Sequence, residues 1–302
     1  MHRLILHRVF ENKFHLLLLD VLPKYTSLGA LQSREKVSKA WYEYHKDGVP
    51  DGAAELVQER VAVGRKYGLS TDALARLDVG LAQALLINTV PISAWMLLHI
   101  FSSPSLLSQI RGECAQLMEN GILDHTKIRE KCPLLVSTWL EVLRFTSYLP
   151  SGRHVLEDTV ISDRYLLRKG ATVLIPSGIL HADSTIWGPD AAEFDPRRFL
   201  KKQHKNQNMA FRGFGGGTLL CPGRHFAFTE VLTFVATMVL GFDITHENGG
   251  VLTVPERDMY NPSLGVLKPV TNTKVSITPR VGFEGMAWTY DLDGMDLERV
   301  GA

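Results

Sequence analysis

The chain has 302 residues, of which 45% are hydrophobic and 22% charged, and its formal net charge at pH 7 is +1. This balance is typical of a soluble globular protein, and it excludes the strongly basic surface on which nucleic-acid binding depends, so we predict no nucleic-acid partner. The three cysteines, Cys114, Cys132 and Cys221, are too few and too scattered for a disulfide framework or a cysteine-rich zinc site. Any function for cysteine must therefore depend on a single residue.

Two apolar stretches raise the question of a membrane segment. The first, Leu16 to Leu19, is flanked by charged residues and is too short for a signal peptide or a span. The second, Leu81 to Phe101, has no Asp, Glu, Lys or Arg over about twenty residues, which is the length of a transmembrane helix. Because polar residues also run through its middle, we favour a long helix buried in a protein core over a membrane span.

The apolar spacing along the chain predicts a mainly α protein with small β-sheets. In the first part of the chain we expect two helices within 33–67 that are broken near 48–52, a long helix after a cap at 70–72, a helix over 102–121 that ends at Gly121, and a helix over 132–147. Short strands follow within 153–161 and 164–178, with turns at 162–163 and 169–170. The last expected elements are a helix over 224–240 and a terminal hairpin within 252–280.

The most informative stretch is FRGFGGGTLLCPGRHF, from Phe211 to Phe226. Its cysteine, Cys221, lies just before the predicted helix, whose positive N-terminal end favours the thiolate form that binds metals. The glycines before it allow the backbone to lie close to a ligand. His225 is too near in sequence to be the base for a cysteine nucleophile, because neighbours on a helix point to different faces. A metal whose other ligands come from a cofactor, such as haem, suits one thiolate.

With this loop the chain resembles the cytochrome P-450 superfamily of haem-thiolate monooxygenases. The haem-binding signature of that superfamily, Phe-x-x-Gly-x-x-x-Cys-x-Gly, is matched by Phe214, Gly217, Cys221 and Gly223. Four fixed positions within ten residues make this a specific match.

Two upstream motifs strengthen the resemblance. The superfamily's Glu-x-x-Arg is matched by Glu141 and Arg144, and FDPRRF resembles its Pro-Glu-Arg-Phe element, with Arg197 in place of the glutamate. The resemblance implies that Arg198 joins Glu141 and Arg144 in a buried structural triad.

The resemblance also implies a fold: a cytochrome P-450 fold of which this chain is the C-terminal portion, truncated at the N-terminus. Residues 1–302 are then part of one domain. Its parts are helices within 1–80, the long oxygen-side helix at 81–101, the Glu-x-x-Arg helix, strands and Pro-x-Arg-Phe element within 141–200, the cysteine loop and following helix within 211–240, and the hairpin within 252–280.

In such an enzyme haem b is the cofactor and Cys221 is the axial ligand of its iron. Phe214 is expected to pack near the sulfur, and Arg153 stands at the position from which the superfamily contacts a haem propionate. Electrons are expected from NADPH through a cytochrome reductase that docks near Arg212 and Arg224.

The long helix departs from the superfamily's pattern. Where Ala-Gly-x-Asp/Glu-Thr is usual, this chain has ALLINT, with Asn88 in place of the acid and Thr89 after it. INTVPISAW resembles the branch that contains cholesterol 7α-hydroxylase and prostacyclin synthase, together with fungal enzymes of secondary metabolism. Asn88 and Thr89 are the catalytic candidates, with proton delivery through water or Thr89. Alternatively, Asn88 supports a helix kink at Pro91.

Two further departures concern the cofactor and the membrane. Leu219 stands where the superfamily often has a basic residue that holds a propionate. The resemblance implies the cytoplasmic face of the endoplasmic-reticulum membrane for full-length members. We expect this chain to lack their N-terminal anchor, with the cytoplasm as the alternative location.

Three hypotheses for function follow: a monooxygenase fed by a reductase, a haem-thiolate isomerase or dehydratase that uses no O2, and a truncated gene product that does not hold haem. For the first two, the expected substrate is a lipophilic small molecule. The residues expected to line the substrate site are Leu85, Leu86 and Thr89, residues 149–152 and residues 262–266.

Overall fold

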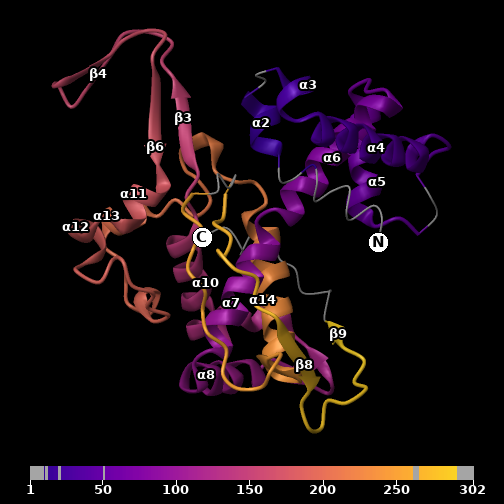
Figure 1. The fold of residues 1–302 in the computed structure, drawn as a ribbon, viewed down its shortest axis with the longest axis vertical. Helices are drawn as coiled ribbons and strands as arrows, with labels where there is room; N and C mark the ends of the chain where they lie inside the picture. The colour runs from indigo at the N-terminus through magenta and orange to yellow at the C-terminus, as the bar shows by residue number, and fades with distance from the viewer. Residues whose placement is uncertain (1–9, 11–12, 20–21, 50–51, 261–264, 291–302) are drawn as a thin grey trace. The chain divides into compact units, whose positions relative to one another are not determined.

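The computed structural model describes residues 10, 13–19, 22–49, 52–260 and 265–290, and it divides into two compact units, Met1–Asn88 and Thr89–Ala302 (Figure 1). The prediction of a mainly α protein with small sheets is confirmed. That both units belong to one domain stays a prediction.

The first unit is helical throughout its described residues outside the turns. Its helices are α2 (Phe14–Leu19), α3 (Pro23–Thr26), α4 (Leu28–His45), α5 (Glu55–Lys66) and α6 (Thr71–Leu86). The predicted break between α4 and α5 includes Gly48, whose φ of 112° favours glycine. The predicted cap at Ser70 is present, since its Oγ accepts a hydrogen bond from Ala73 N at 3.2 Å.

One buried carboxylate connects three helices of this first unit. Asp78 of α6 accepts a hydrogen bond from Nε2 of His45, the last residue of α4, at 2.6 Å. It also accepts one from Nη2 of Arg60 on α5 at 2.8 Å. Because a buried carboxylate is stable only when paired, this cluster fixes how α4, α5 and α6 meet.

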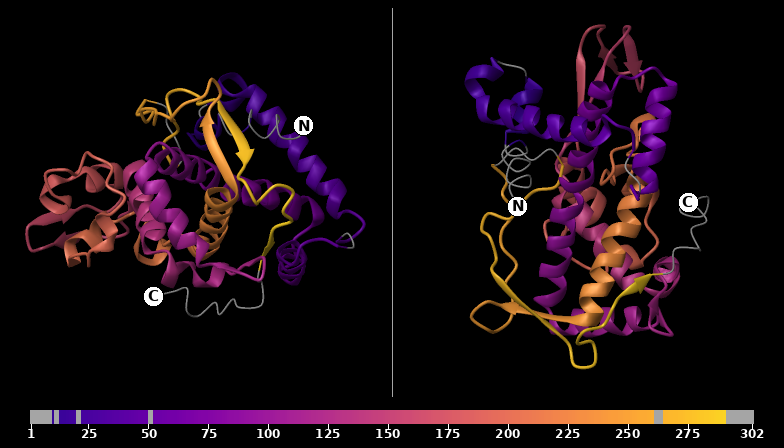
Figure 2. Two further views of the ribbon diagram at one scale, coloured as in Figure 1. Left: turned by 90° about the horizontal axis from the view of Figure 1, so that it is seen from below. Right: turned by 90° about the vertical axis from the view of Figure 1, so that its right-hand side faces the viewer.

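Four helices form the core of the second unit. They are α7 (Thr89–Phe101), α8 (Pro104–Ala115), α10 (Pro133–Thr146) and α14 (Arg224–Gly241). Helix α14 packs against the other three, and Figure 2 shows it lying beside α7. The buried stripe of α14 has residues four apart, Val231, Val235 and Val239, each fully shielded from solvent.

Shorter helical segments connect the core helices to the loops. They are η1 (His125–Lys127), α9 (Ile128–Lys131), α11 (Ser177–Ala182), α12 (Ser184–Trp187), η2 (Arg198–Leu200), α13 (Lys205–Ala210) and η3 (Gly217–Leu219). Helix α10 begins at Pro133 as predicted, and the Glu113 carboxylate of α8 accepts hydrogen bonds from Leu134 N at 2.9 Å and Leu135 N at 3.0 Å. These bonds satisfy main-chain donors that a helix N-terminus leaves free.

The strands of the second unit form four small sheets. Strands β3 (Pro150–His154) and β6 (Thr172–Pro176) pair antiparallel, as do β4 (Thr159–Ile161) and β5 (Tyr165–Leu167), and β7 (Phe242–His246) and β8 (Val275–Pro279). In the fourth, β2 (Ile122–Leu123) pairs with β1 (Met118–Glu119) and β9 (Thr289–Tyr290). The predicted turn at Ser162 and Asp163 joins β4 to β5, with φ of 55° and 51°.

The long helix predicted over 81–101 is divided. Helix α6 ends at Leu86, α7 begins at Thr89, and residues 87–88 form a turn. Pro91 has no N–H to donate to the carbonyl of Ile87, four residues earlier, and its ring crowds that carbonyl. The interruption therefore falls one helical turn before the proline.

Two other elements differ from prediction. The helix expected to reach Gly121 stops at Ala115, because Asn120 and Gly121, with φ of 51° and 81°, form the two-residue turn of the β1–β2 hairpin. The terminal hairpin within 252–280 forms only in part. Asp258 N donates to Lys268 O at 2.8 Å, but β8 pairs with β7, and residues 261–264 lie outside the described residues.

Residues 71–101 are the one stretch of the described chain that is long and apolar enough to cross a membrane, and 44% of its most apolar part is buried within the structure. Core helices of soluble proteins pass the same test. In α7, the side chains of Trp95, Met96 and Ile100 are buried in the core of the second unit. This burial favours the core-helix interpretation for α7.

A buried histidine makes this core sensitive to acid. His99 of α7 stacks on Phe194, with ring centroids 3.6 Å apart. Burial, with a smaller contribution from the positive charge of Arg257, lowers the pKa of His99 to about 4. The neutral imidazole is therefore the form that the folded chain holds.

We expect the free energy of unfolding to fall as the pH drops from about 6.5 to about 4, because the unfolded histidine binds a proton that the folded one resists. The contribution of His99 to the free energy of unfolding is fully present above the pKa of the histidine in the unfolded chain. Near pH 5, His99 should account for a loss of about 2 kcal/mol. His99→Phe keeps a stacked ring but removes the proton site, so urea unfolding near pH 7 and near pH 5 should show a smaller acid loss in this variant.

His154→Phe, on the exposed side of β3, is the matched control and should leave the acid loss unchanged. An acid loss of equal size in the wild type and in His99→Phe would contradict the assignment.

Candidate active site

The segment that presents Cys221, residues 212–221, is a loop closed by its own main chain, and we call it the cysteine loop. Cys221 N donates to Phe214 O at 3.0 Å, and Leu220 N donates to Gly217 O at 3.2 Å. Gly215 and Gly217 have φ of 77° and 68°, where a side chain would be strained. The glycines are therefore needed by the turns of the loop itself.

Cys221 stands two residues before Gly223, the N-cap of α14. Its carbonyl oxygen accepts hydrogen bonds from Arg224 N at 3.4 Å and from Arg224 Nη1 at 3.2 Å. The thiol is free and partly exposed, whereas Cys114 and Cys132 are buried. Cys221 is thus the cysteine that a ligand can reach.

Phe214 anchors the other end of the closed loop to the core. Its ring centroid lies 5.7 Å from that of Trp139 on α10, which in turn meets Phe228 of α14 edge to face at 5.3 Å. These ring contacts with α10, and through Trp139 with α14, fix the position of the loop relative to the core helices.

Arg153 reaches the same loop from a distant part of the sequence. It lies on β3, on the less exposed side of the strand, and its Nη2 donates to Gly216 O at 3.2 Å. The structure therefore brings Arg153 and the cysteine loop together. Residues that bind one cofactor must lie close to one another in this way.

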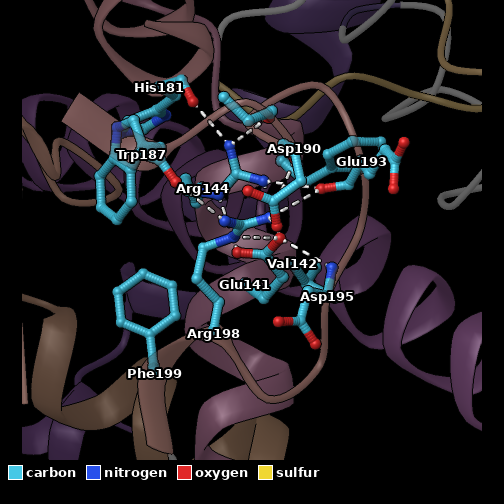
Figure 3. A network of polar contacts seen from close by, with 12 residues as sticks. Glu141, Val142, Arg144, His181, Trp187, Asp190, Glu193, Asp195, Arg198 and Phe199 are labelled. Carbon is cyan, nitrogen blue, oxygen red and sulfur yellow. Dashed lines mark hydrogen bonds and ion pairs between the residues drawn. The ribbon is translucent and has the colours of Figure 1, made fainter. Parts of the chain in front are cut away.

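Glu141, Arg144 and Arg198 also meet, in a buried network that Figure 3 shows. Arg144 binds the Glu141 carboxylate through Nε and Nη2, each at 2.7 Å, and Arg198 Nε binds Glu141 Oε1 at 3.1 Å. Glu141 is 0% exposed and Arg144 2% exposed, so the carboxylate offsets positive charge that water cannot reach.

Main-chain carbonyls and the Asp190 carboxylate satisfy the remaining donors of the two arginines (Figure 3). Arg144 Nη1 donates to His181 O at 2.6 Å and to Ala191 O at 2.8 Å. Arg198 donates to Trp187 O at 3.2 Å and to Asp190 O at 3.0 Å. The network therefore holds the segment from α11 to η2 against α10.

His181 connects this network to the cysteine loop. Its Nε2 accepts a hydrogen bond from Arg212 N at 2.8 Å, while Nδ1 lies 3.3 Å from Ser147 O. These partners require the neutral ring with its proton on Nδ1. Burial, with the neighbouring charges of Arg144 and Arg212, lowers the pKa of His181 to about 4, which keeps that form at neutral pH.

Comparison with known proteins agrees with this geometry. A sequence model of one family, described as Cytochrome P-450, matches residues 87–276, which is more than half of the chain. The chain belongs to the cytochrome P-450 family. The match includes Glu141, Arg144, Arg198 and the whole cysteine loop.

Several curated relatives bear monooxygenase or hydroxylase names. A "Cytochrome P-450 monooxygenase" of Gibberella zeae is 33% identical over 78% of this chain and 48% of its own length. "Cytochrome P-450 monooxygenase nodJ" of Hypoxylon pulicicidum is 31% identical over 93% of this chain and 58% of its own length. "25-hydroxycholesterol 7-alpha-hydroxylase" of Rattus norvegicus is 32% identical over 63% of this chain and 51% of its own length. The chain spans about half the length of these relatives.

The residues at the cysteine loop fit the haem that this family binds. Among the residues that the structure describes there is no cluster of three or more His, Cys, Asp or Glu side chains that could hold a metal. A single thiol therefore suits an iron whose in-plane ligands come from a porphyrin. Arg153 supplies a positive charge beside the loop for a propionate.

The two residues predicted for oxygen chemistry fall at the boundary of the units. Asn88 is the last residue of the first unit and Thr89 the first of the second. Asn88 Oδ1 is buried and has no partner among the described residues. The alternative interpretation, in which Asn88 satisfies carbonyls freed by Pro91, would use the Nδ2 donor and stays a prediction.

The predicted substrate-lining residues lie in different environments. Leu86 and Leu149 are 40% and 45% exposed, so both offer apolar surface. Val266 is 3% exposed and belongs to the core of the second unit. Residues 262–264 lie outside the described residues.

One residue of this region carries no signal in the sequence. His181 was not singled out, because a lone histidine in a short apolar helix does not indicate its role. Arg212 is partly exposed, its Nε is buried and its guanidinium lies against Gly216. That a reductase docks near Arg212 and Arg224 stays a prediction.

We expect Glu141→Gln to lower the free energy of unfolding by about 3–5 kcal/mol, because it leaves the buried Arg144 guanidinium without a counter-charge and Arg198 with only the partly exposed Asp190 carboxylate. Guanidinium-chloride unfolding followed by circular dichroism measures this change.

Glu43→Gln is the matched control, since Glu43 also pairs with a basic residue three positions later, Lys46, but both side chains are about half exposed. It should leave the free energy of unfolding nearly unchanged, because water screens an exposed ion pair. Equal losses in the two variants would show that Glu141 is not the charge that the network requires.

Proposed function

We propose that the protein is a haem-dependent monooxygenase that hydroxylates or otherwise oxidises a lipophilic small molecule. The observation that carries this proposal is the free Cys221 thiol at the end of a closed glycine loop, two residues before the N-cap of an 18-residue core helix. Relatives named as monooxygenases support it.

The reaction needs a cofactor and an electron source. Haem bound through a cysteine thiolate supplies the activation of O2 and the oxidation of an unreactive C–H bond. One oxygen atom enters the C–H bond and the other leaves as water, which consumes two electrons and two protons along with O2. We propose NADPH as the electron source, through a cytochrome reductase that docks on the side of the loop where Arg224 begins α14.

The residues of this chain have distinct tasks in the proposal. The Cys221 sulfur would hold the haem iron, and the loop closed by Cys221 N and Phe214 O keeps that sulfur in place. Arg153 pairs with a haem carboxylate. Thr89 holds or passes on a proton, with Asn88 as a neutral hydrogen-bonding partner that cannot act as an acid near neutral pH.

The substrate class and location are also proposals. In the second unit, a partly exposed apolar residue such as Leu149 suits a lipophilic substrate, and the hydroxylase of Rattus norvegicus is named for a sterol substrate. The resemblance to fungal enzymes favours a role in secondary metabolism. We place the protein at the endoplasmic-reticulum membrane, where lipophilic substrates concentrate.

A second candidate is a haem-thiolate isomerase or dehydratase that uses no O2. Asn88 favours it, because this position carries no ionisable acid for proton delivery. Dependence of turnover on NADPH and reductase separates the two candidates. The third possibility, a chain that holds no haem, is tested by the haem content of the purified protein.

The ligand assignment is tested by the carbon monoxide difference spectrum of the reduced protein. We expect a strongly red-shifted Soret band in the wild type and its loss in Cys221→Ser, because a serine cannot supply the thiolate.

Cys132→Ala, which removes a buried cysteine far along the chain from the loop, should keep the red-shifted band. A red-shifted band that persists in Cys221→Ser would overturn the assignment. A wild type that takes up haem but never shows the band would overturn both enzyme candidates.

A further inference from the structure

Two arginines contact the same glycine of the cysteine loop. Arg153 Nη2 donates to Gly216 O at 3.2 Å. A side-chain Cβ built on Gly216 would lie 1.7 Å from Arg212 Nη1, so the Arg212 guanidinium occupies the space that any larger residue would need. Gly216 has an extended backbone with φ of 176°, which any residue adopts, so its lack of a side chain makes room for Arg212.

The position of Arg212 is fixed at its backbone. Arg212 N donates to His181 Nε2 at 2.8 Å, and Arg212 O accepts from Gly215 N at 3.0 Å. These two bonds hold the residue on both sides of its Cα, so the side chain is directed by the loop.

Neither guanidinium has an acidic partner among the residues that the structure describes. Arg153 donates to the carbonyls of Gly152 and Gly216, and Arg212 Nε is buried without a partner among the described residues. The two local stretches of sequence, 142–156 and 196–229, contain no Asp or Glu. Two like charges therefore meet at one glycine, and neither is ion-paired with a carboxylate of the described residues.

The same chain shows how such a pair is balanced elsewhere. In the buried network, one carboxylate, that of Glu141, bridges Arg144 and Arg198. At Gly216 the two arginines are present, but no acidic side chain pairs with them in the part of the chain that the structure describes. A ligand that carries a carboxylate would complete the arrangement, because charge-assisted bonds to guanidinium are strong and two arginines can share one carboxylate.

We propose that Arg212 and Arg153 together form a carboxylate site that binds a propionate of haem, with Arg212 as a positioning residue for the cofactor. This inference rests on the proposed function, and it adds a contact at Arg212 to the one expected of Arg153. Leu219, which is 68% exposed, supplies no charge to the loop, so Arg212 provides the second cation from a different position.

The test compares haem with haem dimethyl ester, in which both carboxylates are esterified. Apoprotein of the wild type, Arg212→Gln and Arg212→Lys is reconstituted with each cofactor, and the rate of transfer to apomyoglobin is measured. We expect Arg212→Gln to lose haem about tenfold faster than the wild type or more, since a bond to a charged group is lost. Arg212→Lys should fall between the two, because lysine keeps the charge but not the planar fork.

With the dimethyl ester, the wild type and Arg212→Gln should release the cofactor at the same rate. Arg168→Gln, an exposed arginine in the turn between β5 and β6, is the matched control and should behave as the wild type. Circular dichroism melting of each variant separates loss of folding from loss of cofactor.

Two results would overturn the proposal: equal rates of haem loss in the wild type and Arg212→Gln, or an acceleration of equal size with haem and with the ester. The second would assign Arg212 a packing role only. Failure of the proposed function is distinct, because it appears in the wild type itself, as the absence of the red-shifted carbon monoxide band with haem bound.

Discussion

The Glu141 carboxylate is the group on which the second unit depends. It offsets the buried charges of Arg144 and Arg198, and a charge left unpaired in the interior would cost several kcal/mol. Arg144 donates to His181 O, and His181 Nε2 accepts from Arg212 N at the start of the cysteine loop. A continuous path of polar contacts thus runs from α10 to the segment that presents Cys221. The position of the cysteine loop therefore depends on the pairing of Glu141 with Arg144 and Arg198, which lie outside the loop.

This network explains how a segment with little regular structure stays in one conformation. Between α11 and η2 the only helix is α12, of four residues, so most main-chain carbonyls there have no helical partner. Each guanidinium offers five donors in a fixed plane, and Arg144 and Arg198 direct theirs to the carbonyls of residues 181–193. Lysine in either place would supply the charge without the planar set of donors.

The sequence was most informative where function fixes residues at a set spacing. Phe214, Gly217, Cys221 and Gly223 lie within one ten-residue segment, so the loop could be predicted, and Glu141 and Arg144 share one helix face. The interruption at residues 87–88 was harder, because Pro91 acts on a carbonyl four residues earlier. Asn120 and Gly121 carried a hairpin signal that the apolar spacing of the preceding helix obscured. The direction of Arg212 could not be predicted, since it depends on His181, 31 residues earlier, and on space above Gly216.

The unequal exposure of the cysteines gives the chain a built-in reporter. Cys114 and Cys132 are completely buried, and the hydrogen bond between them, together with burial, raises the pKa of the Cys114 thiol. Alkylating reagents attack accessible thiolates, so the folded chain offers them one target of three, in the loop itself. One modified cysteine per molecule would mark a folded second unit, three would mark its opening, and protection of the one would mark a cofactor seated on the sulfur.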